Sequence, residues 1–307
     1  MMSWFRTRSL EAYRRWLKSP AQRIGLHQPL AATASYTRRM ASRGKSLYAG
    51  IRAALPPHTI RHTFEDITVV FPVRTRWQWE RFRSPHNEHV VLADMASEIR
   101  PDDVVYDVGA YLGWHTCVAS QAASSGRVIA FEPHPFSFAR LRTVLAASAP
   151  NAMALCYALS DHEGEVFFSH ESGPGSRCLV PGEPGIEVDA GRGDILVERY
   201  ELPPPDVIKI DVEGAELGVL VGLRGTISQP RCRLIYCEIH PELMKEFGST
   251  AGQVLAFLQD HGFDCAKFDD QPLKWTIKAT RQGGSSRPSP SALSPKRATN
   301  TREDHAR

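Results

Sequence analysis

The sequence predicts an α/β fold in which a mostly parallel sheet has helices on both faces. From residue 88 onward, short apolar segments of strand character alternate with helical segments, and this alternation is typical of parallel sheets. Three strands are continuously apolar, among them VVYDVGA at 104–110, which indicates burial on both faces. Such sheets bind ligands beyond the carboxyl ends of their strands, so a site is expected in the turns that lead from strand to helix.

The expected elements follow one another along the chain. The first helix ends before Pro101, and the expected helices span 88–99, 113–123, 135–148, 214–224 and 250–261. Segments rich in β-branched and aromatic residues predict strands, at 64–72, 104–110, 127–133, 153–160, 165–170, 206–211, 233–239, 263–268 and 273–279.

Charge divides the chain of 307 residues into three parts. Residues 1–62 hold 12 Lys/Arg and one acid, and residues 281–307 hold six Lys/Arg and two acids. The segment between them is acidic, with 31 acids and 19 Lys/Arg. We therefore expect a basic helical N-terminal extension at 1–62, a folded domain at 63–280 and a disordered basic tail at 281–307.

The N-terminal extension has an amphipathic pattern. Leu10, Tyr13 and Leu17 recur at helical spacing with arginines between them. This helix could pack on the main domain, lie in a membrane interface or belong to a cleaved organelle transit segment. A second basic helix is expected over 41–55, ending at Pro56-Pro57.

Cysteine usage and hydropathy indicate a cytoplasmic protein. The six cysteines form no CxxC pair and have no zinc-type spacing with histidine, so reduced thiols are expected. No apolar stretch reaches the length of a transmembrane helix, and no secretory signal pattern is present. The basic ends leave a peripheral contact with an anionic membrane open.

The segment DVGAYLG at 107–113 forms the first strand-to-helix turn. Asp107 ends the strand, Gly109 follows it and Gly113 opens the helix. Glycine lets the backbone bend tightly and lets a ligand approach closely. The middle glycine of the dinucleotide fingerprint is missing, and Tyr111 stands where a pyrophosphate needs bare backbone. A ligand without phosphate therefore fits this turn better.

Acidic residues follow the next strands at the same edge of the sheet. Glu132, in FEP, lies 25 residues after Asp107 and can accept hydrogen bonds from both ribose hydroxyls of an adenosine. Asp161, in ALSDHEG, could reach an adenine amino group or serve as a turn residue before Gly164.

The fourth and fifth strands end in a second group of polar residues. In KIDVEGAE, Asp211 closes a strand, and Glu213 and Glu216 can share one face at the start of the helix, where Glu216 could also be only a cap. In CEIHPE, Glu238 and His240 point to one face of an extended segment. His240 or Glu213 is the candidate base for a hydroxyl acceptor. No metal is expected, although Mg²⁺ or Mn²⁺ would suit this oxygen and nitrogen set.

Taken together, DVGAYLG, FEP, ALSDHEG, VIKIDVEGAE and YCEIHPE resemble the FkbM-type methyltransferase family of class I S-adenosylmethionine (SAM)-dependent methyltransferases. The resemblance runs from about residue 88 to 270, and IDVEGAE is its most specific part. It implies a Rossmann-like, seven-stranded sheet with one antiparallel strand near its end, and SAM as the cofactor. The family commonly has Asn at the position of Tyr111.

The charge pattern agrees with this cofactor, because SAM is cationic and carries no phosphate, and an acidic strand edge attracts it. The expected SAM-binding residues are Asp107, Gly109, Ala110, Gly113, Glu132, Asp161 and Asp211. The expected catalytic residues are His240, Glu213 and Asp211.

The expected reaction is O-methylation of a hydroxyl on a sugar, a lipid-linked glycan or a small metabolite. Its acceptor pocket is expected in 60–87 and 170–200, where Trp77 and Trp79 could stack on a sugar ring or pack in a hairpin. A specific nucleic-acid acceptor is not expected. The alternative is a non-catalytic protein with a degenerate SAM fold that binds an anionic surface, membrane or nucleic acid, through its basic N-terminus. A nicotinamide-dependent reductase is disfavoured, since neither Tyr200 nor Tyr236 has a lysine four residues on.

Overall fold

The computed structural model describes residues 54–282 except 86–87, 170–176, 180–182 and 184. Its centre is a seven-stranded sheet in the order β11-β12-β10-β9-β3-β4-β5. Only β12 runs antiparallel to its neighbours within this sheet. The strands span Val104–Val108 (β3), Arg127–Phe131 (β4), Ala152–Leu155 (β5), Val207–Ile210 (β9), Leu234–Ile239 (β10), Phe263–Asp270 (β11) and Trp275–Arg281 (β12). The predicted fold class is confirmed.

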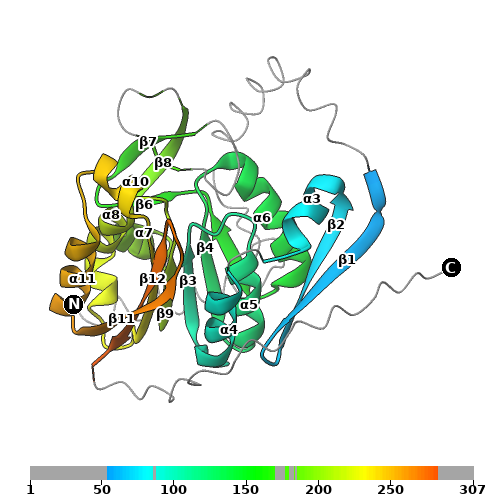
Figure 1. Cartoon of the computed structure of the whole chain (residues 1–307), viewed down its shortest axis with the longest axis horizontal. Helices are drawn as coiled ribbons and strands as arrows, with labels where there is room; N and C mark the ends of the chain where they lie inside the picture. The colour runs from blue at the N-terminus through cyan, green and yellow to red at the C-terminus, as the bar shows by residue number, and fades with distance from the viewer. Residues whose placement is uncertain (1–53, 86–87, 170–176, 180–182, 184, 283–307) are drawn as a thin grey trace, which may run out of the picture.

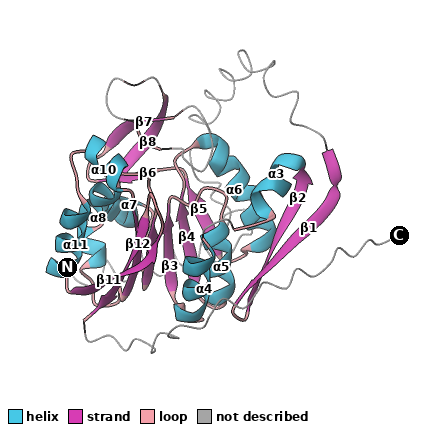
Figure 2. Cartoon of the chain, in the orientation of Figure 1, coloured by secondary structure: helices cyan, strands magenta, loops and turns pink. Residues whose placement is uncertain are grey.

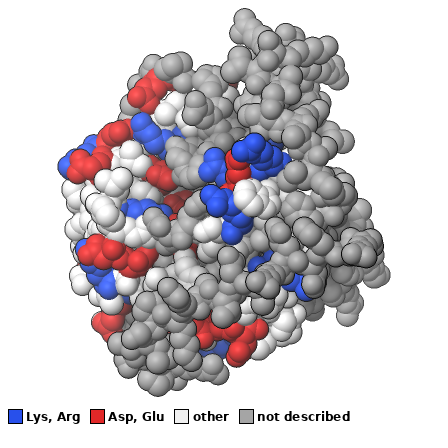
Figure 3. Space-filling model, turned by 45° about the vertical axis from the view of Figure 1, so that its right-hand side comes forward, with Lys and Arg blue, Asp and Glu red and all other residues white. Residues whose placement is uncertain are grey.

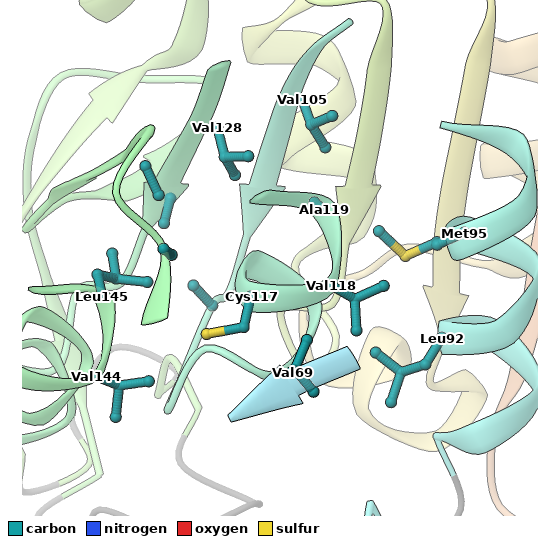
Figure 4. Packing of buried hydrophobic residues seen from close by; sticks show 14 of the residues in the cluster. Val69, Leu92, Met95, Val105, Cys117, Val118, Ala119, Val128, Val144 and Leu145 are labelled. Atoms are coloured by element: carbon teal, nitrogen blue, oxygen red, sulfur yellow. The ribbon is translucent and has the colours of Figure 1, made fainter. Parts of the chain in front are cut away.

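Helices cover both faces of the sheet (Figures 1 and 2). One face carries α4 (His89–Glu98), α5 (Trp114–Ala122) and α6 (Pro135–Ser148). The other carries α7 (Gly193–Arg199), α8 (Glu216–Gly222), α9 (Arg224–Ile227) and α11 (Ala251–Asp260). Neighbouring strand residues serve opposite cores, because side chains alternate across a sheet. Val105 packs with Val118 and Val128 on the first face (Figure 4), whereas Tyr106 packs on the second.

A β-hairpin precedes the sheet and packs on α5 and α6 (Figure 1). It consists of β1 (Ala54–Phe64) and β2 (Ile67–Thr75), joined at Glu65-Asp66. The expected strand 64–72 is thus divided by this turn. The hairpin leads into α3 (Arg76–Phe82), which Thr75 caps by accepting a hydrogen bond from the backbone N–H of Gln78.

The expected end of the second basic helix is wrong. Residues 54 and 55 belong to β1, which continues through Pro56-Pro57, and a strand without a second neighbour tolerates proline. The rest of that helix and the amphipathic segment around Leu10 lie outside the described residues. The expected boundary between residues 62 and 63 falls within β1.

A second departure concerns the expected strand at 153–160. It breaks after Leu155, and the following β6 (Ala158–Ser160) joins a separate three-stranded sheet with β7 (Gly164–Phe168) and β8 (Ile186–Arg192). Four elements have no counterpart in the sequence-based prediction, namely β8, α3, α7 and α10 (Pro241–Glu246), and the helix expected at 214–224 is α8 followed by α9.

The described surface carries side chains of both charges, and the described cysteines are not cross-linked. Figure 3 shows acidic and basic side chains interspersed on one face. All six cysteines lie in the described part and are free thiols. Among the described residues, no helix has both the length and the apolar character needed to span a bilayer.

Candidate active site

A cavity of about 450 Å³ opens at the carboxyl ends of β3, β4 and β9. Its volume lies in the range of about 300–1,000 Å³ that is usual for small-molecule sites. Of the expected site residues, five contribute to its wall: Gly109, Ala110, Glu132, Asp211 and Glu213. The parallel register of these three strands brings their ends together, as the sequence pattern predicts.

The glycine turn brings the backbone just after β3 close to the backbone just after β9. Gly109 has φ of 81°, and a Cβ atom there would lie 1.8 Å from the carbonyl oxygen of Asp211. Tyr111 also has a left-handed backbone, with φ of 47°. Asn adopts this conformation more readily than most residues, which accounts for the Asn that resembling sequences have here. Tyr111 keeps the turn despite its larger side chain.

Glu132 holds the turns after β3 and β4 together. One carboxylate oxygen accepts a hydrogen bond from the backbone N–H of Tyr111 at 2.7 Å, and the other accepts one from the N–H of His134 at 2.9 Å. Burial raises the pKa of Glu132 to about 7, although both N–H groups oppose the shift. Each carboxylate oxygen has another lone pair, so the residue can still accept two ribose hydroxyls from the cavity.

Asp107 and Gly113 lie behind the cavity wall rather than in it. Asp107 is fully buried, and its Oδ2 accepts a 2.5 Å hydrogen bond from the Thr116 hydroxyl. Gly113 has φ of 92° and is the N-cap of α5. Both residues shape the turn that presents Gly109 and Ala110 to a ligand.

Lys209 is the main cavity residue that the sequence pattern did not predict. Its Nζ lies 3.6 Å from Asp107 Oδ1, 3.3 Å from Asp211 Oδ2 and 3.4 Å from the carbonyl oxygen of Gly109. Burial alone would lower the pKa of Lys209, but Asp211 and Asp107 outweigh it and raise the pKa. The signal was a single lysine within the apolar strand VIKI.

Lys274, Glu88 and His115 also line the cavity without having been predicted. Lys274, from the loop before β12, forms ion pairs with Glu88 at 2.8 Å and with Glu238. His115 Nε2 lies 3.6 Å from Glu88. These residues come from segments far apart in the chain, so local patterns give no sign that they meet.

His240 lies at the centre of an acidic cluster. Its Nδ1 is 2.8 Å from Glu216 Oε1, and its Nε2 faces Glu238 at 3.4 Å, Glu213 at 3.5 Å and Asp211 at 3.9 Å. Burial opposes the imidazolium charge, but the hydrogen bond to Glu216 and the other carboxylates raise the pKa of His240 to about 11. His240 itself does not line the cavity.

The two acids of this cluster that reach the cavity differ in protonation. Burial and the neighbouring charge of Asp211 raise the pKa of Glu213 to about 7. Burial would also raise the pKa of Asp211, but Lys209 and His240 hold it near 2. A carboxylate and a carboxyl that titrates near neutral pH therefore stand side by side in one wall.

Asp161 is not part of the cavity wall. It lies in the turn after β6, with hydrogen bonds to Ser160 and His162, and its side chain is 52% exposed. The expected contact with adenine assumed that 153–160 was one strand of the main sheet. Because β6 pairs with β8 instead, the alternative interpretation as a turn residue fits the structure.

The two segments expected to form the acceptor pocket, 60–87 and 170–200, differ in what they contribute to the cavity. Arg81 and Pro85 from the first segment and Phe168 from the end of β7 line it. Trp77 and Trp79 lie in α3 rather than in the hairpin, and neither lines the cavity. Trp77 packs beside Phe136 and beneath the guanidinium of Arg140, whereas Trp79 is 40% exposed.

The fold and this cavity define a SAM-dependent methyltransferase of the Rossmann-like α/β class. The family model described as "Methyltransferase FkbM domain" matches residues 107–265. The chain therefore belongs to the FkbM methyltransferase family, as its motifs predicted, and SAM is its cofactor.

Curated relatives support the same family. The chain is 34% identical over 173 residues to the hexuronic acid methyltransferase AglP of Haloferax volcanii. This alignment covers 55% of this chain and 70% of AglP. It is 27% identical to the 31-O-demethyl-FK506 methyltransferase FkbM of Streptomyces tacrolimicus, over 54% of this chain and 74% of the relative. It is 25% identical to the 2-O-methyltransferase NoeI of Sinorhizobium fredii, over 61% and 84%.

Solved structures resemble the chain more distantly. The match to TYW2 of M. jannaschii in complex with AdoMet has 12% sequence identity and a TM-score of 0.40, and covers 74% of this chain and 88% of that one. The match to TrmK of M. capricolum in complex with S-adenosyl-homocysteine has 9% identity and a TM-score of 0.41, over 64% and 70%.

The residues present fit SAM. Gly109 and Ala110 line the cavity with little side chain, and each carboxylate oxygen of Glu132 has a lone pair beyond its backbone hydrogen bond. The acids of the wall suit the ammonium and sulfonium charges.

Proposed function

We propose that the protein transfers the methyl group of SAM to a hydroxyl oxygen of a sugar, a lipid-linked glycan or a small metabolite. The observation that carries this proposal is that Glu132 and Glu213 line one cavity. Glu132 supplies the acceptors for an adenosine ribose, and Glu213 supplies a carboxylate for an acceptor's proton in the same space.

The relatives support an oxygen acceptor on a sugar. One of them is named for hexuronic acid, another is named as a 2-O-methyltransferase, and their similarity spans more than half of this chain. A hexuronic acid or a related sugar is therefore the first acceptor to test.

We assign SAM binding to Gly109, Ala110, Glu132 and Asp211, which line the cavity. Asp107 and Gly113 support the turn from behind. SAM, when bound, supplies an electrophilic methyl group. The cavity walls hold the acceptor oxygen in line with it. Such alignment lowers the activation barrier by several kcal/mol, about 7–11 kcal/mol at most.

Glu213 is the better of the two candidate bases. It lines the cavity, whereas His240 has its Nδ1 on a fully buried carboxylate and its Nε2 turned toward three others. A positioned base contributes about 10²–10⁴-fold to the rate. His240 acts in this assignment by holding Glu213 and Asp211 in place.

Three further assignments remain proposals based on sequence. They are the division into 1–62, 63–280 and 281–307, the cytoplasmic location and the peripheral membrane contact. Most of the lysines and arginines of the two basic ends lie outside the described residues.

The test uses the full chain with methyl-labelled SAM and a panel of uronic acids, neutral hexoses and glycans. We expect label in an oxygen-linked methyl group of a sugar, a loss of about 10²-fold or more in Glu213→Gln, and wild-type turnover in Asp161→Asn, the control outside the cavity. Methyl transfer to nitrogen or carbon, or full turnover by Glu213→Gln, would contradict the proposal.

A further inference from the structure

The Nε2 atom of His240 points into a space that is enclosed by carboxylates. Glu238 Oε1, Glu213 Oε2 and Asp211 Oδ1 lie 3.4, 3.5 and 3.9 Å from it. These carboxylates are the recorded contacts of Nε2 within the described part of the chain, and His240 is only 7% exposed. A buried nitrogen at this distance from three oxygens has room for a shared cation between them.

The opposite edge of the same ring is fixed. Nδ1 is hydrogen-bonded to Glu216 Oε1, and this carboxylate has no exposed surface and also accepts the backbone N–H of Gly214 at 2.9 Å. A histidine whose one nitrogen donates to a buried carboxylate presents the other nitrogen as a ligand, an arrangement that is common around metal ions.

The local charge is strongly negative. Five carboxylates surround this end of the cavity, namely Glu88, Asp211, Glu213, Glu216 and Glu238. Among the described residues, the two lysines that pair with them are Lys209 and Lys274. Even with a charged His240, negative charge remains in excess, and a divalent cation would offset it.

We propose that His240 Nε2, Asp211 Oδ1 and Glu213 Oε2 bind one divalent cation such as Mg²⁺ or Mn²⁺. One ligand atom from each residue lies within 4.8 Å of the others, and ligands at about 2.1 Å from a common octahedral centre have comparable separations. The nitrogen and oxygen set suits these ions. Binding displaces the Nε2 proton of the imidazolium, which passes to solvent.

The cation also serves the proposed function, on which this part of the inference rests. Asp211 and Glu213 line the cavity, so the open side of the cation faces the acceptor. A hydroxyl that approaches it there becomes more acidic. Glu213 binds through Oε2 alone, and its second oxygen remains to accept the hydroxyl proton.

The test measures binding of Mn²⁺ alone to the full chain after treatment with a chelator, by the electron paramagnetic resonance signal of free Mn²⁺. We expect one Mn²⁺ per chain, and affinity reduced about tenfold or more in both Asp211→Asn and Glu213→Gln, because loss of even a second-shell partner costs about 10–100-fold. Glu242→Gln is the matched control, since Glu242 lies near His240 in sequence but is exposed and paired with Lys245.

Unfolding of a variant is separated from loss of the site by circular dichroism and by thermal melting. Added Mn²⁺ is expected to raise the melting temperature of wild type and Glu242→Gln and not that of the other two variants. No Mn²⁺ binding to wild type, or equal affinity in all four proteins, would overturn the inference. Because neither SAM nor acceptor is present, site-dependent binding supports the cation site even if no sugar is methylated.

Discussion

The carboxylate of Glu132 accepts a hydrogen bond from the backbone N–H of Tyr111 at 2.7 Å. This contact joins the turn after β3 to the turn after β4 and holds a buried acid beside the bare backbone of Gly109. The geometry explains why the two motifs, DVGAYLG and FEP, act together. One shapes the surface on which an adenosine lies, and the other supplies the hydrogen-bond acceptors.

Cofactor binding is expected to depend on pH through Glu132. Burial raises the pKa of this carboxyl to about 7, and ribose hydroxyls donate to its ionised form, so affinity falls as the pH drops below 7. We expect S-adenosylhomocysteine to bind about tenfold more weakly at pH 6 than at pH 8. Calorimetric titrations at the two pH values check this, and a Glu132→Gln variant should show a flatter profile.

The ligand-free protein should respond to pH in the opposite direction at this residue. The folded pKa of Glu132 lies above its ordinary value of 4.5, so its contribution to stability is fully present below that value and is lost as the pH rises through about 7. A wild-type profile that matches Glu132→Gln in both binding and stability would count against the raised pKa.

Replacing Lys209 is expected to damage the fold. Lys209→Met leaves Asp107 and Asp211 without their shared cation in the interior, and breaking a buried ion pair costs about 3–5 kcal/mol. Urea unfolding measures this loss. The matched control is Lys245→Met, whose exposed pair with Glu242 is worth about 1 kcal/mol or less; equal losses in the two variants would contradict the role of Lys209.

The glycine turn should tolerate no side chain at Gly109. A Cβ atom there would meet the Asp211 carbonyl oxygen at 1.8 Å, and overpacking typically costs about 1–3 kcal/mol, occasionally more, in addition to the backbone strain. Gly248 has a similar φ of 65° but open space around its Cβ position. Gly248→Ala should therefore cost only the conformational strain of about 1–2 kcal/mol. Thermal unfolding of both variants tests the difference.

The sequence predicted most of the sheet because its strands are short, apolar and regularly spaced. The turns after β3, β4 and β9 were placed correctly, and with them Gly109, Glu132, Asp211 and Glu213. Their location in one cavity could be predicted because the carboxyl ends of parallel strands meet at one edge.

What the sequence could not show depends on contacts between distant segments. Lys274 and Glu88 meet across 186 residues of chain, and no local pattern signals such a pair. Asp161 lies outside the cavity wall because the segment 153–160 forms two strands rather than one, and the break after Leu155 transfers β6 to another sheet. The end of the second N-terminal helix was wrong because prolines, which end helices, also occur in a strand with one free edge.

The most direct test of the cofactor site is calorimetric titration of S-adenosylhomocysteine into wild type, Glu132→Ala and Asp161→Ala at pH 8. The structure predicts binding to wild type, affinity reduced about tenfold or more in Glu132→Ala through lost hydrogen bonds to a charged group, and unchanged affinity in Asp161→Ala. No binding to wild type, or a loss in Asp161→Ala that equals the loss in Glu132→Ala, would contradict the assignment of this cavity to SAM.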